Sequence, residues 1–397
     1  MPRFVAVPVG QGDAFFLDKG GWSALVDGGR SISSFASVFQ NTTHTDSVNV
    51  LVCTHNDADH TNGVIGFLES GLRCDEVWLP GRWLGAVAEV LQPFINVSYI
   101  LASEISHDPR TENSTRLRLS GTTAFERYAD LMHDSTDADR VIGESQETDD
   151  DGWTAGLRGL LEQAESWQTH PSSLAPYPGF LHPDYRGVYG LTHPVQWELL
   201  WSAIEAADRI RRIALAAFHH GIRVRWFEYE PFHPIGVGGA QLQPVNARVI
   251  AQVRPFKGTL LRLLALTVSN RESLVFWSPS AQKCPGVLFT ADSDLQGVQL
   301  PSGISGSIVT APHHGSEANA NAYSAISGKG CQDVTWVRSD GRYMTRPGKA
   351  YLQLSDRRLC TICRLATGKS SRKQAVELFT RKGIWVRKKA TAVCGCQ

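Results

Sequence analysis

The sequence predicts a mixed α/β (α+β) fold organised around one polar turn. Three short apolar runs, separated by glycine turns, occupy residues 4–26, which is the pattern of a β-meander at the start of an antiparallel or mixed sheet. A fourth apolar run at 48–53 leads into a turn rich in His and Asp, and a helix-like stretch follows at 61–70. A rigid strand-to-helix turn of this kind can hold polar side chains in fixed positions.

Composition sets the broad class of the protein. A chain of 397 residues is long enough for one large domain or two ordinary ones. Its 42% hydrophobic and 20% charged residues are typical of a soluble globular protein, and its eight cysteines do not indicate a disulfide scaffold. Because no apolar stretch reaches membrane-spanning length and a strand-like run begins at once, we expect no signal peptide, no membrane partner and a cytoplasmic location.

Four groups able to hold a divalent cation lie in the turn at 55–60. They are His55, Asp57, Asp59 and His60. Imidazole suits transition metals and carboxylate suits harder ions, so this set favours Zn²⁺ or Mn²⁺ over calcium or a thiolate-bound structural zinc. A helix start would also favour Asp but has no use for two histidines. We therefore predict a site for one or two divalent ions.

Further polar motifs follow apolar runs elsewhere, and together they carry a resemblance. In chain order the motifs are Gly-Gln-Gly-Asp at 10–13, Asp-Gly-Gly at 27–29, Thr-His-x-Asp-x-Asp-His at 54–60, Asn-x-x-Ser at 270–273, Leu-Phe-Thr-Ala-Asp at 288–292 and His-His-Gly-Ser at 313–316. This pattern resembles the metallo-β-lactamase superfamily, and more closely the branch that contains the hydrolase domain of the DNA-uptake protein ComEC. The match covers roughly residues 1–80 and 220–345.

The resemblance implies a fold and roles for particular residues. The fold would be a four-layer αββα sandwich with the metal site at one edge between the two sheets. Asp292 would bridge two metals, and His313 or His314 would be the late histidine ligand. Asp59 would act with Asp27 and Asp13 in the catalytic set, the latter two orienting the ligands.

Three departures, two from the superfamily pattern and one from the branch pattern, affect the metal site. Asp57 stands where hydrolytic members often carry His, and no His lies between His233 and His313. The branch's Tyr-Gly-His-Pro segment reads Tyr-Met-Thr-Arg-Pro at 343–347. Occupancy could fall to one ion, or Arg342 or Arg346 could contact a phosphate instead. A site with more oxygen and less nitrogen also shifts the preference toward Mn²⁺.

The resemblance does not extend over residues 81–218, for which we expect an inserted helical subdomain that covers the metal cleft or receives a partner. Apolar spacing predicts helices at 83–95, 123–132, 153–167 and 194–218, joined by polar, mobile links at 134–151 and 170–183. His219-His220-Gly221 fits a helix end. We expect the two halves of the sandwich at 1–80 and 219–345. The insertion would span 81–218, and a basic segment would span 346–397.

The basic segment suggests a partner. Residues 338–389 carry fifteen Lys or Arg against three acidic residues, although the chain as a whole has 39 of each sign. Such asymmetry indicates either a polyanion partner or simply a solvated basic face. Arg342, Arg346 and Lys349 are candidate nucleic-acid contacts. Aromatic residues in the same region either stack on unpaired bases or pack in the core; they are Trp336, Tyr343, Tyr351 and Trp385.

A second metal site is an open alternative at the C-terminal end. Cys360 and Cys363 form a Cys-x-x-Cys pair, and Cys394 and Cys396 form a distant Cys-x-Cys pair. The four thiols would bind a structural zinc, or they would be free thiols on strands.

Function follows from the metal turn and the basic segment together. The expected activity is a metal-dependent phosphodiesterase or nuclease, most simply acting on DNA, for example in defence against phage, with a regulatory protein as a further possible partner. One alternative is a small-molecule hydrolase acting on a lactone or cyclic nucleotide. Another is a binding subunit whose metal site has decayed.

Overall fold

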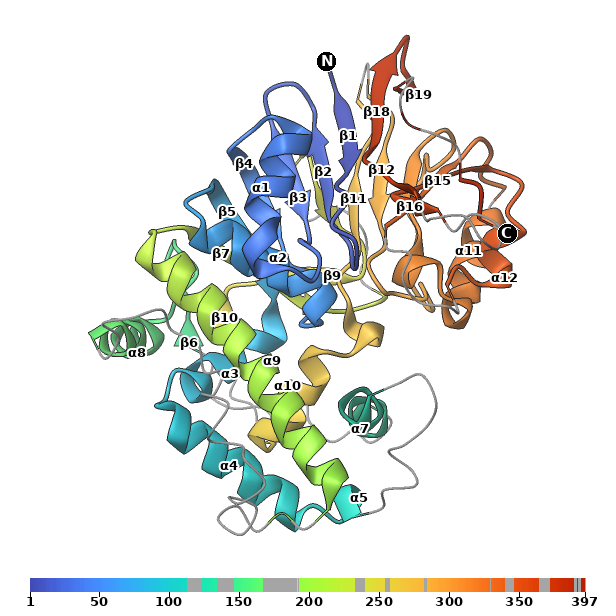
Figure 1. Cartoon of the computed structure of the whole chain (residues 1–397). Coiled ribbons are helices and arrows are strands. Elements are labelled where there is room, and N and C mark those ends of the chain that lie inside the picture. Colours follow the sequence, from blue (N-terminus) through green and yellow to red (C-terminus); the bar gives the residue numbers. More distant parts are fainter. Residues whose placement is uncertain are drawn as a thin grey trace. The chain divides into compact units, whose positions relative to one another are not determined.

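The computed structural model describes residues 1–112, 123–133, 146–166, 191, 193–232, 240–253, 258–281, 284–328, 330–339, 346–363, 372–388, 391 and 394–396. The fold is mixed α/β, as the sequence predicted (Figure 1). The chain divides into two compact units. Unit 1 contains 1–79, 227–249 and 270–397, and unit 2 contains 80–226 and 250–269.

A mixed nine-stranded sheet begins with the predicted meander. The strand order is β19 (Ile384–Arg387), β18 (Val376–Arg381), β1 (Arg3–Ala6), β2 (Phe15–Asp18), β3 (Ser23–Val26), β4 (Ser47–Val52), β5 (Arg73–Pro80), β7 (Arg223–Tyr229) and β9 (Ala247–Ile250). Strands β1 to β3 pair antiparallel, whereas β3, β4 and β5 pair parallel. Strand β18 pairs with β1, so the C-terminal segment is part of the same sheet as the N-terminus.

A second mixed sheet of unit 1 contains the later motifs. Its order is β15 (Arg357–Cys360), β14 (Thr335–Arg338), β13 (Ile308–Thr310), β12 (Val287–Phe289), β11 (Phe276–Ser278) and β8 (Gln243–Pro244). Strands β12 to β15 are parallel to one another. Their C-terminal ends therefore lie at the same edge of the sheet, which brings the residues that follow β12 and β13 close together.

The two sheets of unit 1 share one apolar core. Alternate residues of the first sheet, such as Phe4 and Phe15, enter the same buried cluster as Phe276 and Phe289 of the second sheet. The Phe15 and Phe289 rings lie 6.4 Å apart. Each such buried aromatic side chain contributes on the order of 2 kcal/mol to folding, so this core fixes the edges at which the polar residues lie.

Helices cover the outer face of each sheet. The first sheet is covered by α1 (Ile32–Thr43) and α2 (Ala58–Glu69) (Figure 1). These helices pack through Phe39, whose ring lies 5.7 Å from both Phe16 and Phe67. On the second sheet, α11 (Ala320–Gly328) and α12 (Lys349–Leu352) join a separate buried cluster that includes Tyr323 and Trp336. The strands are therefore apolar on both faces, which explains their continuous hydrophobic runs.

Unit 2 is mainly helical. Its helices are α3 (Gly81–Val90), α4 (Phe94–His107), α5 (Pro109–Glu112), α7 (Ala124–His133), α8 (Ala155–Ser166), α9 (Pro194–His219) and α10 (Leu260–Thr267), with a small ribbon of β6 (Gln146–Glu147) and β10 (Gln252–Val253). Among the described residues no single helix is long and apolar enough to cross a membrane, although the bent pair α3 and α4 passes that test together.

Two expectations for this region differ from the structure. The predicted helix at 83–95 is two helices, because Pro93 lacks an amide donor and disfavours helical geometry at Gln92. Arg211 donates to the carbonyl oxygens of Val90 and Leu91 and so satisfies the end of α3. Residues 219–226 and 250–269, expected in the sandwich, belong to unit 2. In the second of these segments, α10 packs against α3 and α7. Of the links expected at 134–151 and 170–183, residues 134–145 and 170–183 lie outside the described residues.

Candidate metal centre

The strand-to-helix turn between β4 and α2 presents several ligand groups to one space. Asp57 occupies the N-cap position of α2, but its side chain makes no capping hydrogen bond. Its carboxylate faces His55 instead, with Oδ2 3.7 Å from His55 Nε2. His60 lies in the first turn of α2, and its ring centroid is 4.2 Å from that of His55. The turn therefore brings together both of its histidines and one of its aspartates.

Asp27 orients this turn from the end of β3. Its carboxylate accepts hydrogen bonds from Thr54 N at 2.9 Å, from Thr54 Oγ1 at 2.8 Å and from His60 Nδ1 at 2.8 Å. Since the Thr54 hydroxyl donates its proton to Asp27, it accepts from His55 Nδ1 at 3.0 Å. In their neutral forms both histidines therefore direct the Nε2 lone pair toward the centre.

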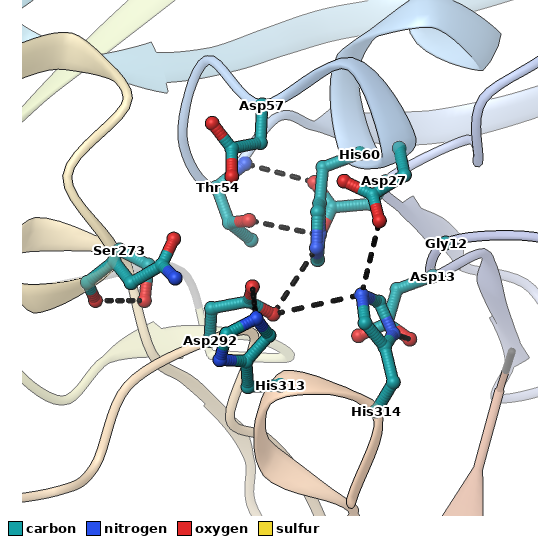
Figure 2. A network of polar contacts seen from close by, with 12 residues as sticks. Gly12, Asp13, Asp27, Thr54, Asp57, His60, Ser273, Asp292, His313 and His314 are labelled. Carbon is teal, nitrogen blue, oxygen red and sulfur yellow. Dashed lines mark hydrogen bonds and ion pairs between the residues drawn. The ribbon is translucent and has the colours of Figure 1, made fainter. Parts of the chain in front are cut away.

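Asp292 follows the end of β12 and lies close to the imidazoles of His60, His313 and His314 (Figure 2). Its Oδ1 atom is 3.1 Å from His60 Nε2 and 4.0 Å from His314 Nε2. Its Oδ2 atom is 3.5 Å from His313 Nε2 and 3.8 Å from His55 Nε2. Each oxygen of one carboxylate therefore belongs to a different set of candidate ligands.

The two late histidines reach the centre through an unusual backbone turn. His313 and His314 have φ of 46° and 55°, and Gly315 follows with φ of 86°. Asn319 holds this turn, because its Oδ1 atom lies 3.2 Å from His313 Nδ1 and its Nδ2 donates to Asp292 O at 2.8 Å. Left-handed backbone at successive non-glycine residues is costly and clusters at functional sites.

Asp13 and Asp59 complete the group around His314. Asp13 Oδ1 lies 2.9 Å from His314 Nδ1, so this carboxylate accepts the ring proton and turns Nε2 toward Asp292. His314 Nε2 is also 3.4 Å from Asp59 Oδ2. Asp13 and Asp27 therefore have equivalent roles: Asp13 fixes the tautomer and orientation of the His314 imidazole, and Asp27 fixes those of the His60 imidazole.

Two glycines permit the loops of the centre to meet backbone to backbone. A Cβ atom at Gly12 would lie 1.6 Å from Asp59 O, and one at Gly63 would lie 1.9 Å from Gly28 O. The Asp13 amide donates to Asp59 O at 3.1 Å. Glycine is therefore required at both positions. A side chain at Gly12 would push the loop between β1 and β2 away from the start of α2, and one at Gly63 would push α2 away from the segment that follows β3.

The centre is deep on one side and open on the other. The side chains of His60 and His314 are fully buried, and Asp292 is 2% exposed. Three other members are reached by solvent: Asp57 and Asp59 at 18% and His313 at 20% of the side chain. These three residues mark the side from which a water molecule or substrate would enter.

Burial and charge shift the pKa values of the histidines in opposite directions. Burial opposes the charged form of His314, but Asp13 and Asp292 outweigh it and raise its pKa to about 10. The pKa of His60 is likewise raised well above its usual value, because Asp292 and Asp27 outweigh burial. Burial, together with the positive charge of Arg346, lowers the pKa of His313 to about 4.

The pKa values of the carboxylates depend on these imidazoles. Burial alone would raise the pKa of Asp292, but His313, His60 and His314 hold it well below the usual value. Burial raises the pKa of Asp13 despite its His314 partner. Without a metal, the negative charge of the centre is thus compensated by protons on imidazole, and a divalent ion would replace those protons.

The donor set fits a metal ion. Four buried atoms directed at one another make no hydrogen bond of good geometry, although His60 Nε2 and Asp292 Oδ1 are 3.1 Å apart; they are His55 Nε2, His60 Nε2, His314 Nε2 and Asp292 Oδ1. Leaving such groups unpaired costs about 1–3 kcal/mol each. Two groups whose ligand atoms all lie within 4.8 Å share Asp292, namely His55, Asp57, Asp292 and Asp13, His60, Asp292, His314. This buried His/Asp cluster can hold a metal ion.

Other predicted contacts lie at different places. Arg346 lies against His313 Nε2 at the open side of the centre. Lys349 is exposed at the start of α12, and Arg342 lies outside the described residues. The aromatic side chains of Trp336, Tyr351 and Trp385 are buried in the core, so they are not available for stacking on bases; Tyr343 also lies outside the described part of the chain.

Two residues that hold the centre together were not predicted to have this role. Thr54 links Asp27 to His55, and Asn319 links His313 to Asp292. The predicted end of the long helix at His219 is observed: α9 ends there, and Gly221 follows with φ of 60°.

Comparison of the chain with protein-family models gave no match, and comparison with curated proteins gave none either.

Proposed function

We propose that this chain is a metal-dependent hydrolase of the metallo-β-lactamase fold that cleaves phosphodiester bonds, with DNA as the favoured substrate. The arrangement of unit 1 supports the fold part of this proposal. Two mixed sheets share a core, and α1 and α2 cover one outer face while α11 and α12 cover the other. The ligand groups gather where β4, β12 and β13 end.

The observation that carries the proposal is the position of Asp292. One of its oxygens faces His60 and His314, and the other faces His55 and His313. A carboxylate placed in this way is suited to lie between two cations. Asp59 then joins His60 and His314, and Asp57 joins His55. Each set therefore offers imidazole and carboxylate in the proportion that suits Zn²⁺ or Mn²⁺.

When bound, such ions lower the pKa of a water molecule toward neutrality and act as Lewis acids on the group under attack. The residues of the chain prepare the site for that chemistry. Asp27 and Asp13 accept the Nδ1 protons of His60 and His314 and so keep each Nε2 directed inward. The buried walls around Asp292 exclude bulk water, while Asp57 and Asp59 leave one side open.

Positive charge at the surface of unit 1 supports a phosphate-containing substrate. Arg346 stands at the open side beside His313. The side chain of Lys373 lies beside the loop between β1 and β2, because a Cβ atom added at Gly10 would be 3.5 Å from Lys373 Nζ. Exposed lysines and arginines continue along the C-terminal segment; among the described residues they are Lys349, Arg357, Arg381, Lys382 and Lys388.

Cleavage assays with the purified full chain test this function. Supercoiled plasmid and single-stranded DNA are incubated with Mn²⁺, Mg²⁺ or Zn²⁺, and products are resolved on gels. We expect metal-dependent cleavage that is lost in Asp292→Asn. Asp294→Asn is the matched control, because Asp294 is two residues away and its side chain accepts from Gln296 N outside the centre.

The outcomes separate the candidate functions. Hydrolysis of nitrophenyl esters or cyclic nucleotides without DNA cleavage would replace the nuclease with a small-molecule hydrolase. Absence of bound metal together with absence of any hydrolysis would leave a binding protein. Salt-sensitive DNA binding that survives Asp292→Asn would assign the basic surface to binding and not to chemistry.

A further inference from the structure

A second cluster of metal-ligand type lies away from the His/Asp centre. Cys360 at the end of β15, Cys363 in β16 (Ile362–Cys363), and Cys394 and Cys396 near the chain end place their Sγ atoms within 4.8 Å of one another. Cys360 and Cys363 are fully buried and Cys396 is 6% exposed. All eight cysteines of the chain are free thiols.

Backbone hydrogen bonds hold in place both chain segments that carry the cysteines, one with Cys394 and Cys396 and the other with Cys360 and Cys363. The Cys394 amide donates to Arg358 O at 3.0 Å, which fixes the chain end beside β15. On the other arm, the Thr361 amide donates to Arg338 O at 3.0 Å. Thr361 O in turn accepts from Gln374 N at 2.8 Å, next to β17 (Arg372–Lys373). The thiols therefore converge because the surrounding backbone requires it, and not through a single flexible loop.

Groups around the cluster are placed to stabilise thiolate sulfur. The Gly395 amide donates to Cys363 Sγ at 3.4 Å, and Arg338 Nη2 donates to Cys396 Sγ at 3.5 Å. The Tyr351 hydroxyl lies 3.6 Å from Cys360 Sγ. Arg338 is fully buried in β14, and a buried guanidinium requires nearby negative charge. Amide and guanidinium donors to sulfur are the kind of outer contact that metal-bound thiolates receive.

We propose that Cys360, Cys363, Cys394 and Cys396 bind one zinc ion as four thiolates, with Arg338 as the buried counter-charge. Four sulfur ligands select zinc over the harder ions suited to the His/Asp centre, and a closed set of four protein ligands is structural and not catalytic. Ligands at about 2.3 Å around a tetrahedral ion place sulfur atoms about 3.8 Å apart. The four Sγ atoms lie within 4.8 Å of one another, but Cys360 Sγ and Cys394 Sγ are only 2.7 Å apart, so these two sulfurs must separate by about 1 Å to receive the ion.

The zinc would connect distant parts of unit 1. The hairpin of β18 and β19 pairs with β1 in the first sheet, and Cys394 and Cys396 follow that hairpin. Cys360 belongs to the edge strand of the second sheet. Arg338 also lies against the turn that presents His314, since a Cβ at Gly315 would be 2.9 Å from Arg338 Cδ. The site thus anchors the chain end and supports the late-histidine turn from behind.

Metal analysis of the purified full chain tests the proposal. We expect one zinc per chain to remain in Asp292→Asn, to be lost in Cys363→Ser and to remain in Cys331→Ser, the matched control outside the cluster. Because Cys363→Ser could also fail to fold, the second measurement uses chains with native cysteines. Cobalt bound to the Asp292→Asn chain should give thiolate-to-cobalt charge-transfer absorption and the visible bands of a tetrahedral site.

Three results would overturn the zinc assignment. One is a cobalt spectrum without charge transfer from sulfur. Another is iron in place of zinc in protein purified under both aerobic and anaerobic conditions. The third is a mass spectrum showing Cys360 joined to another cysteine by a disulfide in freshly purified protein. None of these results would affect the proposed hydrolase, because all three concern sulfur ligands and the hydrolase requires only the His/Asp centre.

Discussion

The two ligand clusters of unit 1 differ in chemistry and in how completely they are enclosed. The His/Asp centre offers imidazole and carboxylate groups, and Asp57, Asp59 and His313 remain partly exposed. The cysteine cluster offers four sulfur atoms, three of them on buried residues. An open set of harder ligands suits an ion that exchanges water and acts on substrate, whereas a closed set of soft ligands suits an ion that holds the fold.

The same contrast extends to the supporting charges. Carboxylates orient the imidazoles of the His/Asp centre, since Asp27 and Asp13 accept from His60 and His314. The cysteine cluster is supported by donors, among them Arg338 and the Gly395 amide. Negative surroundings increase the affinity of neutral ligands for a cation, and positive surroundings stabilise a thiolate set that carries excess negative charge.

Replacing the shared carboxylate should have the largest effect on activity. In Asp292→Asn one ligand charge is lost from both sets, so we expect DNA cleavage to fall by at least about 100-fold, equivalent to about 2.7 kcal/mol of transition-state stabilisation. Initial cleavage rates at saturating Mn²⁺ measure it, and circular dichroism checks the fold. An Asp292→Asn chain that cleaves DNA at the rate of Asp294→Asn would exclude a catalytic metal at this carboxylate.

Replacing a cysteine should act on stability more than on chemistry. We expect Cys363→Ser to lower the free energy of unfolding by several kcal/mol, because structural zinc contributes its binding energy to folding. Thermal unfolding with and without added zinc measures this effect, and Cys331→Ser should unfold like the parent chain. If Cys363→Ser and Cys331→Ser unfold at the same temperature, the four sulfurs do not hold a structural ion.

Replacing a carboxylate that orients a histidine should have an intermediate effect, on metal affinity. Asp27→Asn preserves the shape of the side chain and tolerates the φ of 58° at this position, but it no longer fixes the ring proton of His60. Metal affinity at the His/Asp centre should fall by about 10- to 100-fold. Titration with Mn²⁺ measures the change, and zinc content at the cysteine cluster should be unchanged. Equal affinity in the variant would show that Asp27 has no role in orienting the ligand.

The pH dependence of metal binding follows from the raised histidine pKa values. In the metal-free protein the pKa of His314 is about 10 and that of His60 is raised, so both rings carry protons at neutral pH. A metal must displace these protons, and its apparent affinity should therefore increase as pH rises toward the His314 pKa. Calorimetric titration in two buffers of different ionisation enthalpy measures the released protons, and binding without proton release would contradict the assignment of His60 and His314 as ligands.

The smallest effect is expected at the open side of the centre. Arg346→Met removes one cation beside His313 but no metal ligand. Metal affinity should remain close to that of the parent chain, while the salt dependence of DNA binding should lose about one phosphate contact. Binding isotherms at several salt concentrations measure the slope. A large loss of metal affinity would instead mean that Arg346 positions His313.

Much of the site was predictable because its residues follow apolar strands. The turn at 55–60, Asp292 and the late histidines each come directly after such a run, and parallel strand ends meet at one edge of a sheet. The assignment of His313 and His314 to different oxygens of Asp292 was not predictable. It depends on positive φ at both residues and on Asn319, and no local pattern encodes either feature.

Long-range pairing limited the prediction in a similar way. Nothing in the N-terminal meander indicates that β18 would extend it, because that pairing joins segments from opposite ends of the chain. The basic composition of the C-terminal segment suggested exposed charge, yet Arg338 is fully buried beside the cysteines. Composition reports the number of charges, whereas their burial is decided by the sheet that carries them.

Anomalous diffraction from a crystal of the full chain grown with Mn²⁺ and Zn²⁺ shows whether Asp292 lies between two metal ions. We predict anomalous density on both sides of the Asp292 carboxylate, one peak beside His55 and His313 and one beside His60 and His314. Each peak should lie about 2.0–2.2 Å from an Asp292 oxygen. Density confined to the four cysteines, with none at Asp292, would contradict the account.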